Sequence, residues 1–422
     1  MGRVFRKILV VILSASLLTG CGVTDVAEKT MVARGSGASG SAAGNDMTSS
    51  RMVGSGNAND YTSYTVPRHE DRRVFWGQQE KDPDGYKYSM DMDISELQWV
   101  TNEWLYYVTY EAGKRWLYRV PIERSEKEGR PQKDKKEKLC KAQDLSVSYA
   151  TEDYLVLIRC DDTKYDYELC RFDLDTRRQT VLLGHKETGG LPGLLSDDRD
   201  GPVWINGNLI AEGAKKLFLV NPDTGENKEI YSWHIGDEDE GIYDYKQIGS
   251  SLYFFLDDSL YQYDGITGKV TLLVRKAVFR EAAEKAAGKK LQDIWVETLF
   301  AEKDSLYFII ETEWEERKAG KRTEFDKQEL FRAPLQDPQS LRREDELMDY
   351  LDKKGEYYLL DEEDEDVGLP LYSHGSSIED MSGGMIYVEY ETKKDSRYVR
   401  YDPETKKIEE CSWDEWRYER RD

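Results

Sequence analysis

The chain has 422 residues, of which 39% are hydrophobic and 34% charged, with 28 Tyr and 10 Trp, so it can bury a sizeable core. Its formal net charge is −23 and its basic residues do not cluster into a stripe, which argues strongly against a nucleic-acid partner. Four His and five Cys along the whole length disfavour zinc, haem and iron–sulfur sites, so we expect no metal and no cofactor.

The first 21 residues, MGRVFRKILVVILSASLLTGC, begin with a basic segment and continue with an apolar run from Ile8 to Leu18. A run of about 11 residues is too short to cross a bilayer roughly 30 Å thick. This pattern predicts an export signal peptide over residues 1–20.

The signal ends in Leu18-Thr19-Gly20-Cys21, which resembles the lipobox of bacterial lipoproteins. The resemblance implies that diacylglycerol is attached to the Cys21 sulfur and that the chain is cleaved before Cys21. The expected location is therefore the outer face of the cell membrane, since two or more acyl chains anchor a protein stably. The alternative is an ordinary secretory signal in which Cys21 is incidental.

Residues 22–59 are dominated by Gly, Ser, Ala, Thr and Asn and contain no aromatic residue. Such a segment cannot bury enough surface to offset its chain entropy, so residues 21–59 are predicted to form a lipidated, flexible tether. About 38 flexible residues have a mean reach of about 30–40 Å. Residues 60–422 are then the folded domain.

A repeated pattern of short apolar strands and polar turns fills the rest of the chain, and it is clearest at residues 243–274. There we expect strands at Leu252–Leu256, Leu260–Tyr263 and Val270–Val274, with a turn at Asp257-Asp258 and another at Asp264-Gly265-Ile266-Thr267-Gly268.

The corresponding turns of other repeats are Asp173-Leu174-Asp175-Thr176, Asn221-Pro222-Asp223-Thr224-Gly225 and Asp402-Pro403-Glu404-Thr405. Residue types that cap their own backbone or accept positive φ explain these turns better than calcium binding does, because each turn lacks a spaced set of carboxylate ligands.

The apolar residue that opens the second strand recurs at positions 105, 155, 209, 252, 306 and 386. Four-stranded units spaced by about 40–50 residues are typical of a β-propeller. We therefore predict an all-β propeller of six blades, or seven if residues 344–376 or 73–91 form a degenerate blade. Short helical insertions are expected near 277–287 and 341–354. An early segment, Arg73–Trp76 or Tyr86–Met90, is expected to pair with the last repeat and close the ring.

The repeated units resemble secreted bacterial β-propellers, including TolB-like propellers and the uncharacterised propeller lipoproteins of Gram-positive bacteria, across residues 95–413. The resemblance implies an architecture and leaves the activity open, because propellers include enzymes, receptors and scaffolds.

Catalytic signatures are missing from the sequence: it has no H-E-x-x-H, and its predicted folded part has no G-x-S-x-G. We therefore assign no catalytic residue. The four His (69, 185, 234 and 374) are expected in surface loops. The acidic runs 237–240 and 361–366 are interpreted as solvated loops, with weak cation binding or a basic partner as the alternative. Tryptophans such as Trp99, Trp204 and Trp314 are expected to pack between blades, although a sugar-binding platform is the alternative.

Cys160 and Cys170 flank a loop centred near residue 165, and a register symmetric about that loop would place them opposite each other. This makes them the candidate disulfide of an exported protein. Cys140 and Cys411 have no pairing that the sequence suggests.

These features favour a membrane-tethered extracytoplasmic propeller that binds a protein or a cell-envelope glycan as a binding or scaffold module, without catalysis. The first alternative is a glycan-processing enzyme of the envelope that uses Asp or Glu at the propeller channel. The second is an assembly factor of a membrane complex.

Overall fold

A computed structural model describes residues 87–88, 96–101, 103–124, 128–161, 164–197, 201–234, 241–318, 321–361, 371–392 and 394–413. The chain divides into two units, residues 1–59 and 60–422, and every described residue belongs to the second. The predicted signal peptide, Cys21, the tether, His69 and the acidic runs at 237–240 and 362–366 lie outside the described residues.

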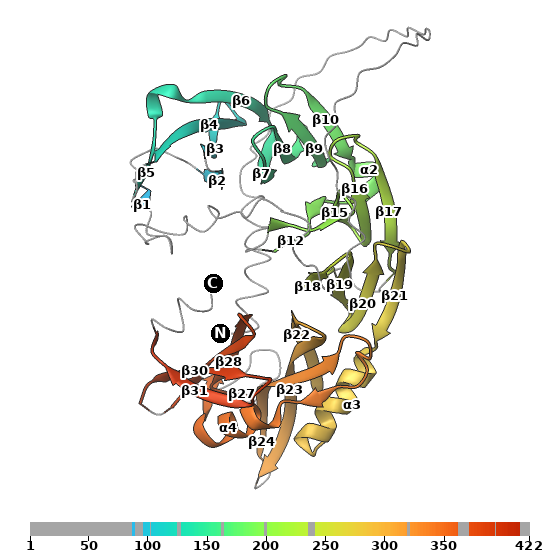
Figure 1. Ribbon diagram of the computed structural model, residues 1–422, viewed down its shortest axis with the longest axis vertical. Coiled ribbons are helices and arrows are strands. Elements are labelled where there is room, and N and C mark those ends of the chain that lie inside the picture. Colours follow the sequence, from blue (N-terminus) through green and yellow to red (C-terminus); the bar gives the residue numbers. More distant parts are fainter. Residues whose placement is uncertain are drawn as a thin grey trace. The chain divides into compact units, whose positions relative to one another are not determined.

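The described part is built from successive antiparallel sheets, labelled in Figure 1. The first sheet contains six strands: β1 (Lys87–Tyr88), β2 (Glu96–Val100), β3 (Trp104–Glu111), β4 (Lys114–Arg124), β5 (Glu128–Pro131) and β6 (Glu137–Ala142). A short 3₁₀ turn, η2 (Lys133–Lys135), precedes β6. The second sheet contains β7 (Asp144–Ala150), β8 (Tyr154–Cys160), β9 (Glu168–Asp173) and β10 (Gln179–Leu183), and the short helix α2 (His185–Thr188) follows it.

The third sheet contains β11 (Gly193–Leu194), β14 (Trp204–Ile205), β15 (Asn208–Gly213), β16 (Lys216–Val220) and β17 (Asn227–Ser232), beside a two-stranded ribbon of β12 (Ser196–Asp197) and β13 (Gly201–Pro202). The fourth contains β18 (Tyr245–Ile248), β19 (Ser251–Leu256), β20 (Ser259–Asp264) and β21 (Lys269–Val274). Helix α3 (Lys276–Ala287) follows the fourth sheet.

The fifth sheet contains β22 (Asp293–Glu302), β23 (Ser305–Lys318), β24 (Lys321–Pro334), β25 (Arg342–Arg343), β26 (Tyr357–Asp361) and β27 (Leu371–His374), and helix α4 (Asp345–Lys354) lies between β25 and β26 in the sequence. The sixth contains β28 (Ser376–Ser382), β29 (Met385–Glu391), β30 (Ser396–Asp402) and β31 (Lys407–Cys411). Repeated, largely antiparallel sheets of this kind are the blades of a β-propeller, as the sequence predicts, and the described residues form six sheets of four to six strands.

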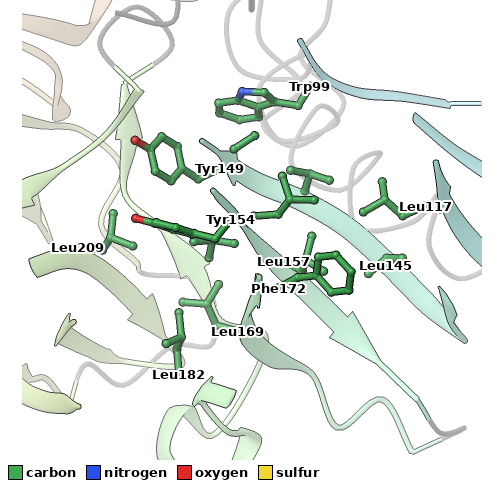
Figure 2. Packing of buried hydrophobic residues seen from close by; sticks show 14 of the residues in the cluster. Trp99, Leu117, Leu145, Tyr149, Tyr154, Leu157, Leu169, Phe172, Leu182 and Leu209 are labelled. Atoms are coloured by element: carbon green, nitrogen blue, oxygen red, sulfur yellow. The ribbon is translucent and has the colours of Figure 1, made fainter. Parts of the chain in front are cut away.

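Apolar side chains pack between consecutive sheets and form buried clusters there. Figure 2 shows the first of these cores, in which Trp99 of β2, Tyr149 of β7 and Leu209 of β15 belong to one buried cluster. Three further clusters join the third sheet to the fourth, the fourth to the fifth and the fifth to the sixth. The order of the sheets along the chain is therefore also their order of packing.

The first strand of four sheets contains an irregularity in register, at Leu97/Trp99, Val147/Tyr149, Val296/Thr298 and Ile378/Asp380. Such a bulge takes a backbone N–H out of the ladder. Side chains of the preceding sheet accept these donors: Val147 N donates to Gln98 Oε1 at 3.0 Å, and Ile378 N donates to Gln328 Oε1 at 2.9 Å. The bulges of β7 and β28 thus connect their sheets to the preceding one.

A second contact between sheets involves an arginine on the third strand. The Arg171 guanidinium lies 4.3 Å from the ring centroid of Tyr154 and donates to the carbonyl of Pro222 at 3.0 Å and to Asp223 at 3.1 Å, in a turn of the next sheet. The same arrangement recurs at the fifth sheet with Arg332, Tyr307, Pro403 and Glu404.

The acidic turns are hydrogen-bonded as the sequence predicts. Asp264 Oδ1 accepts from the amide of Ile266 at 2.8 Å, and its Oδ2 accepts from the Thr267 hydroxyl at 2.8 Å. These bonds lower the pKa of Asp264. At the preceding turn Asp257 and Asp258 both adopt positive φ, 50° and 49°, as a two-residue hairpin turn requires.

Three expectations need correction. The predicted 341–354 helix begins at Asp345, because Arg342 and Arg343 pair as β25 with Arg332 and Phe331. Residues 344–376 form no separate blade, since β26 and β27 extend the fifth sheet. Lys87 and Tyr88 pair in parallel with Glu128 and Gly129 of the first sheet, not with the last one, and Arg73–Trp76 lies outside the described residues.

Candidate functional site

One face of the sixth sheet is turned away from the core. Along β29, Ile386, Val388 and Tyr390 belong to the cluster shared with the fifth sheet, so alternate residues Met385 and Tyr387 lie on the opposite face. The same opposite face carries Arg400 and Asp402 of β30, which alternate with the core residues Val399 and Tyr401. It also carries Lys407 and Glu409 of β31, which flank the core residue Ile408. These six side chains line a hollow of about 310 Å³.

The hollow is polar and charged. Arg400 Nε and Nη2 both lie 2.9 Å from Glu409 Oε2, and Lys407 also pairs with Glu409. The hydrogen bonds from Lys407 and Arg400 lower the pKa of Glu409. Asp402 is held by the amide and hydroxyl of Thr405, which lower its pKa as well. At neutral pH the hollow therefore presents two cations and two carboxylates.

Aromatic side chains adjoin the hollow on the same face. Trp413 is 44% exposed, and its ring centroid lies 5.1 Å from that of Tyr398. Tyr398 is two residues before Arg400 on β30 and therefore lies on the same face of the sheet. Tyr387 lines the hollow but is only 3% exposed, so Trp413 and Tyr398 supply the ring surface. A shallow site of charged donors and acceptors beside flat rings is suited to polar ligands with apolar faces.

A buried ion network lies on the fifth sheet. Lys327 Nζ is 2.9 Å from Glu329 Oε1, Arg343 Nε is 2.6 Å from Glu329 Oε2, and both cations also pair with Asp352 of α4. Glu329 and Lys327 are 5% and 7% exposed. Each buried charge has an opposite partner, so this network stabilises the docking of α4 on β24 and β25.

His374 is the residue in this region that most resembles a catalytic group. Its Nδ1 lies 2.7 Å from Ser376 Oγ, which is the spacing of a base and a hydroxyl nucleophile. However, both residues are buried, and the ring of His374 packs 4.9 Å from that of Tyr357. Burial lowers the pKa of His374 to about 4, so the imidazole is neutral at pH 7. We interpret the pair as a structural hydrogen bond, because substrate would have no approach to it.

Glu212 of β15 is a carboxyl whose pKa lies close to neutral pH. Burial raises its pKa from 4.5 to about 7. Its strand partner is Gly193.

The structure corrects the expected Cys160–Cys170 disulfide. Cys170 lies opposite Leu157 and Cys160 lies opposite Asp144, and both cysteines are buried and outside any disulfide. The register pairs Arg159 with Glu168 and Leu155 with Phe172, so it is centred between residues 163 and 164, and Leu155 and Phe172 pack in the same core. Burial raises the pKa of Cys170 to about 12, and it does the same for Cys140, the free thiol on the neighbouring β6.

The prediction for the tryptophans is confirmed, and the prediction for the histidines is confirmed only in part. Trp99, Trp233 and Trp314 are at most 7% exposed and pack in the cores, as predicted. The expectation of a surface loop is wrong for His374, which is buried at the end of β27. His185 lies at the surface, as expected, but begins α2, and His234 is exposed outside any strand or helix. No group of three or more His, Cys, Asp or Glu side chains in the described part of the chain is arranged to hold a metal ion, and no helix there is long and apolar enough to cross a membrane.

The charged hollow was not anticipated from the sequence. A signal for it was present, because strands β29 to β31 alternate core residues with Met385 and Tyr387, Arg400 and Asp402, and Lys407 and Glu409. Alternation alone, however, does not say whether the second face of a blade is covered.

No protein-family model and no curated protein matches the chain. Among solved structures, it is similar to an uncharacterised protein of Listeria monocytogenes (10% identity, 77% of this chain and 85% of that one, TM-score 0.35). It is also similar to TolB of Acinetobacter baumannii (13% identity, 74% and 64%, TM-score 0.26) and to an oligogalacturonate lyase in complex with manganese (11% identity, 74% and 73%, TM-score 0.34). At these scores the similarity adds nothing to what the strand topology shows, and it says nothing about activity.

Proposed function

We propose that this chain is a membrane-tethered, extracytoplasmic propeller that binds an envelope glycan on the open face of its sixth sheet. The location rests on the signal peptide, the lipobox ending in Cys21 and the Gly/Ser-rich tether. The observation that carries the binding role is the hollow bounded by Tyr387, Arg400, Lys407 and Glu409.

The chemistry of the hollow favours a glycan. Arg400 and Lys407 donate hydrogen bonds, Glu409 and Asp402 accept them, and such alternating donors and acceptors complement sugar hydroxyls. Tyr398 and Trp413 add flat apolar surface beside them. A protein partner would use the same groups and is the other outcome of the test below.

Sedimentation with insoluble peptidoglycan from the cell envelope tests the binding role. We expect Arg400→Ala with Lys407→Ala to weaken cosedimentation at least tenfold, because each change removes a charged hydrogen-bond donor from the hollow. The matched control is Arg397→Ala with Lys394→Ala, in which Arg397 lies on the other face of β30 and Lys394 is exposed just before that strand. Equal binding by the parent and the Arg400/Lys407 variant would overturn the assignment of this face.

The tether is tested separately. Cys21→Ser should abolish incorporation of radiolabelled palmitate and release the protein from the membrane fraction. Palmitate incorporated equally into the variant would contradict lipidation at Cys21.

An envelope enzyme is the second candidate, and Glu212 is the observation that favours it. A carboxyl with a pKa of about 7 is suited to general acid catalysis near neutral pH. Release of new reducing ends from peptidoglycan by the parent protein, but not by Glu212→Gln, would support this candidate over simple binding.

A further inference from the structure

The edge strand β6 and the η2 turn before it carry a local group of exposed lysines, an exception to the dispersed basic residues expected of this acidic chain. Residues 133–141, KDKKEKLCK, contain five Lys against one Asp and one Glu, whereas the whole chain has a net charge of −23. Lys135, Lys136, Lys138 and Lys141 are all exposed. β6 pairs only with β4 among the described strands, so these lysines stand at the margin of the first sheet.

Two aromatic rings of β4 lie beneath these lysines. Lys138 Nζ is 3.8 Å and Lys141 Nζ 4.8 Å from the ring centroid of Trp116, and Lys136 and Lys138 lie 5.5 and 5.4 Å from that of Tyr118. The register explains these contacts, because Trp116 pairs with Lys141 and Tyr118 pairs with Lys138. The lysine side chains are thus placed together over amphipathic rings.

The acidic residues nearby reduce this positive charge only in part. Glu137 Oε2 is engaged by Arg119 at 2.9 Å and by Arg177 at 2.8 Å, so its charge is offset by arginines and not by the lysines. Glu111 pairs with Lys138 at 2.8 Å. Lys136 and Lys141 then keep their charges for an external partner.

We propose that Lys136, Lys138 and Lys141, held over the rings of half-buried Trp116 and buried Tyr118, form a basic patch that docks on the anionic phospholipid headgroups of the membrane. This proposal rests on the membrane tether of the proposed function, since a tether reaching about 30–40 Å keeps the domain near that surface. Charges farther away than about 10 Å are screened at ordinary ionic strength, so the patch is attracted even though the chain as a whole is acidic. Lysines near an anionic leaflet are attracted to it, and the cation–π contacts with Trp116 and Tyr118 hold these lysines together.

Flotation with lipid vesicles tests the patch without the lipid anchor. The parent is the chain starting at residue 21 with Cys21→Ser, and all variants share that start. The probes are vesicles of phosphatidylcholine with 30% phosphatidylglycerol (a composition of about one anionic lipid in three) and of phosphatidylcholine alone. The patch variant is Lys136→Glu with Lys138→Glu and Lys141→Glu. The control makes the same charge change at Lys228, Lys353 and Lys394, which are exposed elsewhere.

We expect the parent and the control to bind anionic vesicles, and the patch variant to bind them roughly 100-fold more weakly, at about fivefold per lysine. We also expect parent binding to disappear in 1 M salt, where the screening length falls to about 3 Å. That salt test keeps the proposal falsifiable if the patch variant does not fold. Equal binding by patch variant and control, or parent binding that salt does not weaken, would overturn the proposal.

Two further outcomes distinguish this proposal from binding of an acidic polypeptide and from the proposed lipid tether. If the parent ignores anionic vesicles but binds soluble polyglutamate, the patch serves an acidic polypeptide and the membrane assignment is wrong. If vesicle binding is as expected but Cys21 carries no lipid in cells, the proposed patch is supported and the proposed lipid anchor is contradicted. The two results are independent because the vesicle experiment uses an unlipidated chain.

Discussion

Gln98 Oε1 accepts a hydrogen bond from the backbone N–H of Val147 at 3.0 Å, across the boundary between the first and second sheets. Val147 lies at the bulge of β7, where its amide has left the strand ladder. Gln328 and Ile378 repeat the arrangement between the fifth and sixth sheets, and Asp258 accepts from Val296 N at 3.0 Å between the fourth and fifth. A hydrogen bond from the amide at a bulge to a side-chain oxygen of the preceding sheet therefore recurs at three sheet boundaries.

Removing that oxygen should destabilise the fold. We expect Gln98→Ala to lower the free energy of unfolding by about 1–3 kcal/mol, because the buried Val147 amide loses its acceptor. Gln179→Ala is the control, since Gln179 is exposed on β10. Urea unfolding monitored by tryptophan fluorescence measures both, and similar midpoints for the two variants would argue against the role of Gln98.

The Arg171 contact should be specific to the guanidinium. Arg171→Ala should lower the free energy of unfolding by about 1–2 kcal/mol, because the bonds to Pro222 and Asp223 and the stacking on Tyr154 are lost together. Arg171→Lys should recover only a part, since an ammonium cannot reproduce the planar fork. Arg178→Ala is the exposed control. Full recovery by lysine in thermal unfolding would show that charge alone matters.

Glu212 should make the fold less stable as pH rises. Its pKa is about 7 in the folded chain and 4.5 when unperturbed, so the unfolded chain loses its proton first and stability falls between those values. Glu212→Gln should therefore be more stable than the parent at pH 8, by about 1–3 kcal/mol, and this gain should shrink towards pH 4. A gain independent of pH, in unfolding followed at both pH values, would contradict the raised pKa.

His374 should act in the opposite direction. Its pKa falls from 6.5 to about 4 in the folded chain, so below pH 6.5 the unfolded chain takes up a proton that the folded chain does not. Stability should then decrease by about 2–3 kcal/mol as pH falls from 6.5 to 4. His374→Asn should be less stable at pH 8, because the contact with Tyr357 is lost, but should not show this added loss in acid. If the variant and the parent lose stability in parallel over this range, His374 is not the group responsible.

Local patterns predicted the blades well. The strands Ser251–Leu256, Ser259–Asp264 and Lys269–Val274 lie within one residue of their predicted ends, because alternating apolar residues and turn-forming Asp and Gly act over short distances. Helix α3 was also predicted, from residues of high helix propensity.

Features that depend on contacts between distant segments were missed. Arg343 was placed in a helix because its neighbours have helical spacing, but Glu329, 14 residues earlier, holds it in a strand. The sequence predicts a surface loop at His374, but packing in the fifth sheet buries this residue. The pairing of Cys170 with Leu157 depends on which side chains share a sheet face, and a loop length does not contain that information.

The cysteines of the first two sheets form no disulfide, and this has a consequence for measuring the motions of this protein. At pH 8 a thiol of pKa about 12, such as that of Cys140 or Cys170, is ionised in only about one molecule in 10⁴, and Cys170 is also fully covered. An alkylating reagent would therefore modify Cys170 mainly during brief openings of the second sheet. The rate of that labelling, read by mass, would report the opening equilibrium of this one region in the intact protein without any added probe.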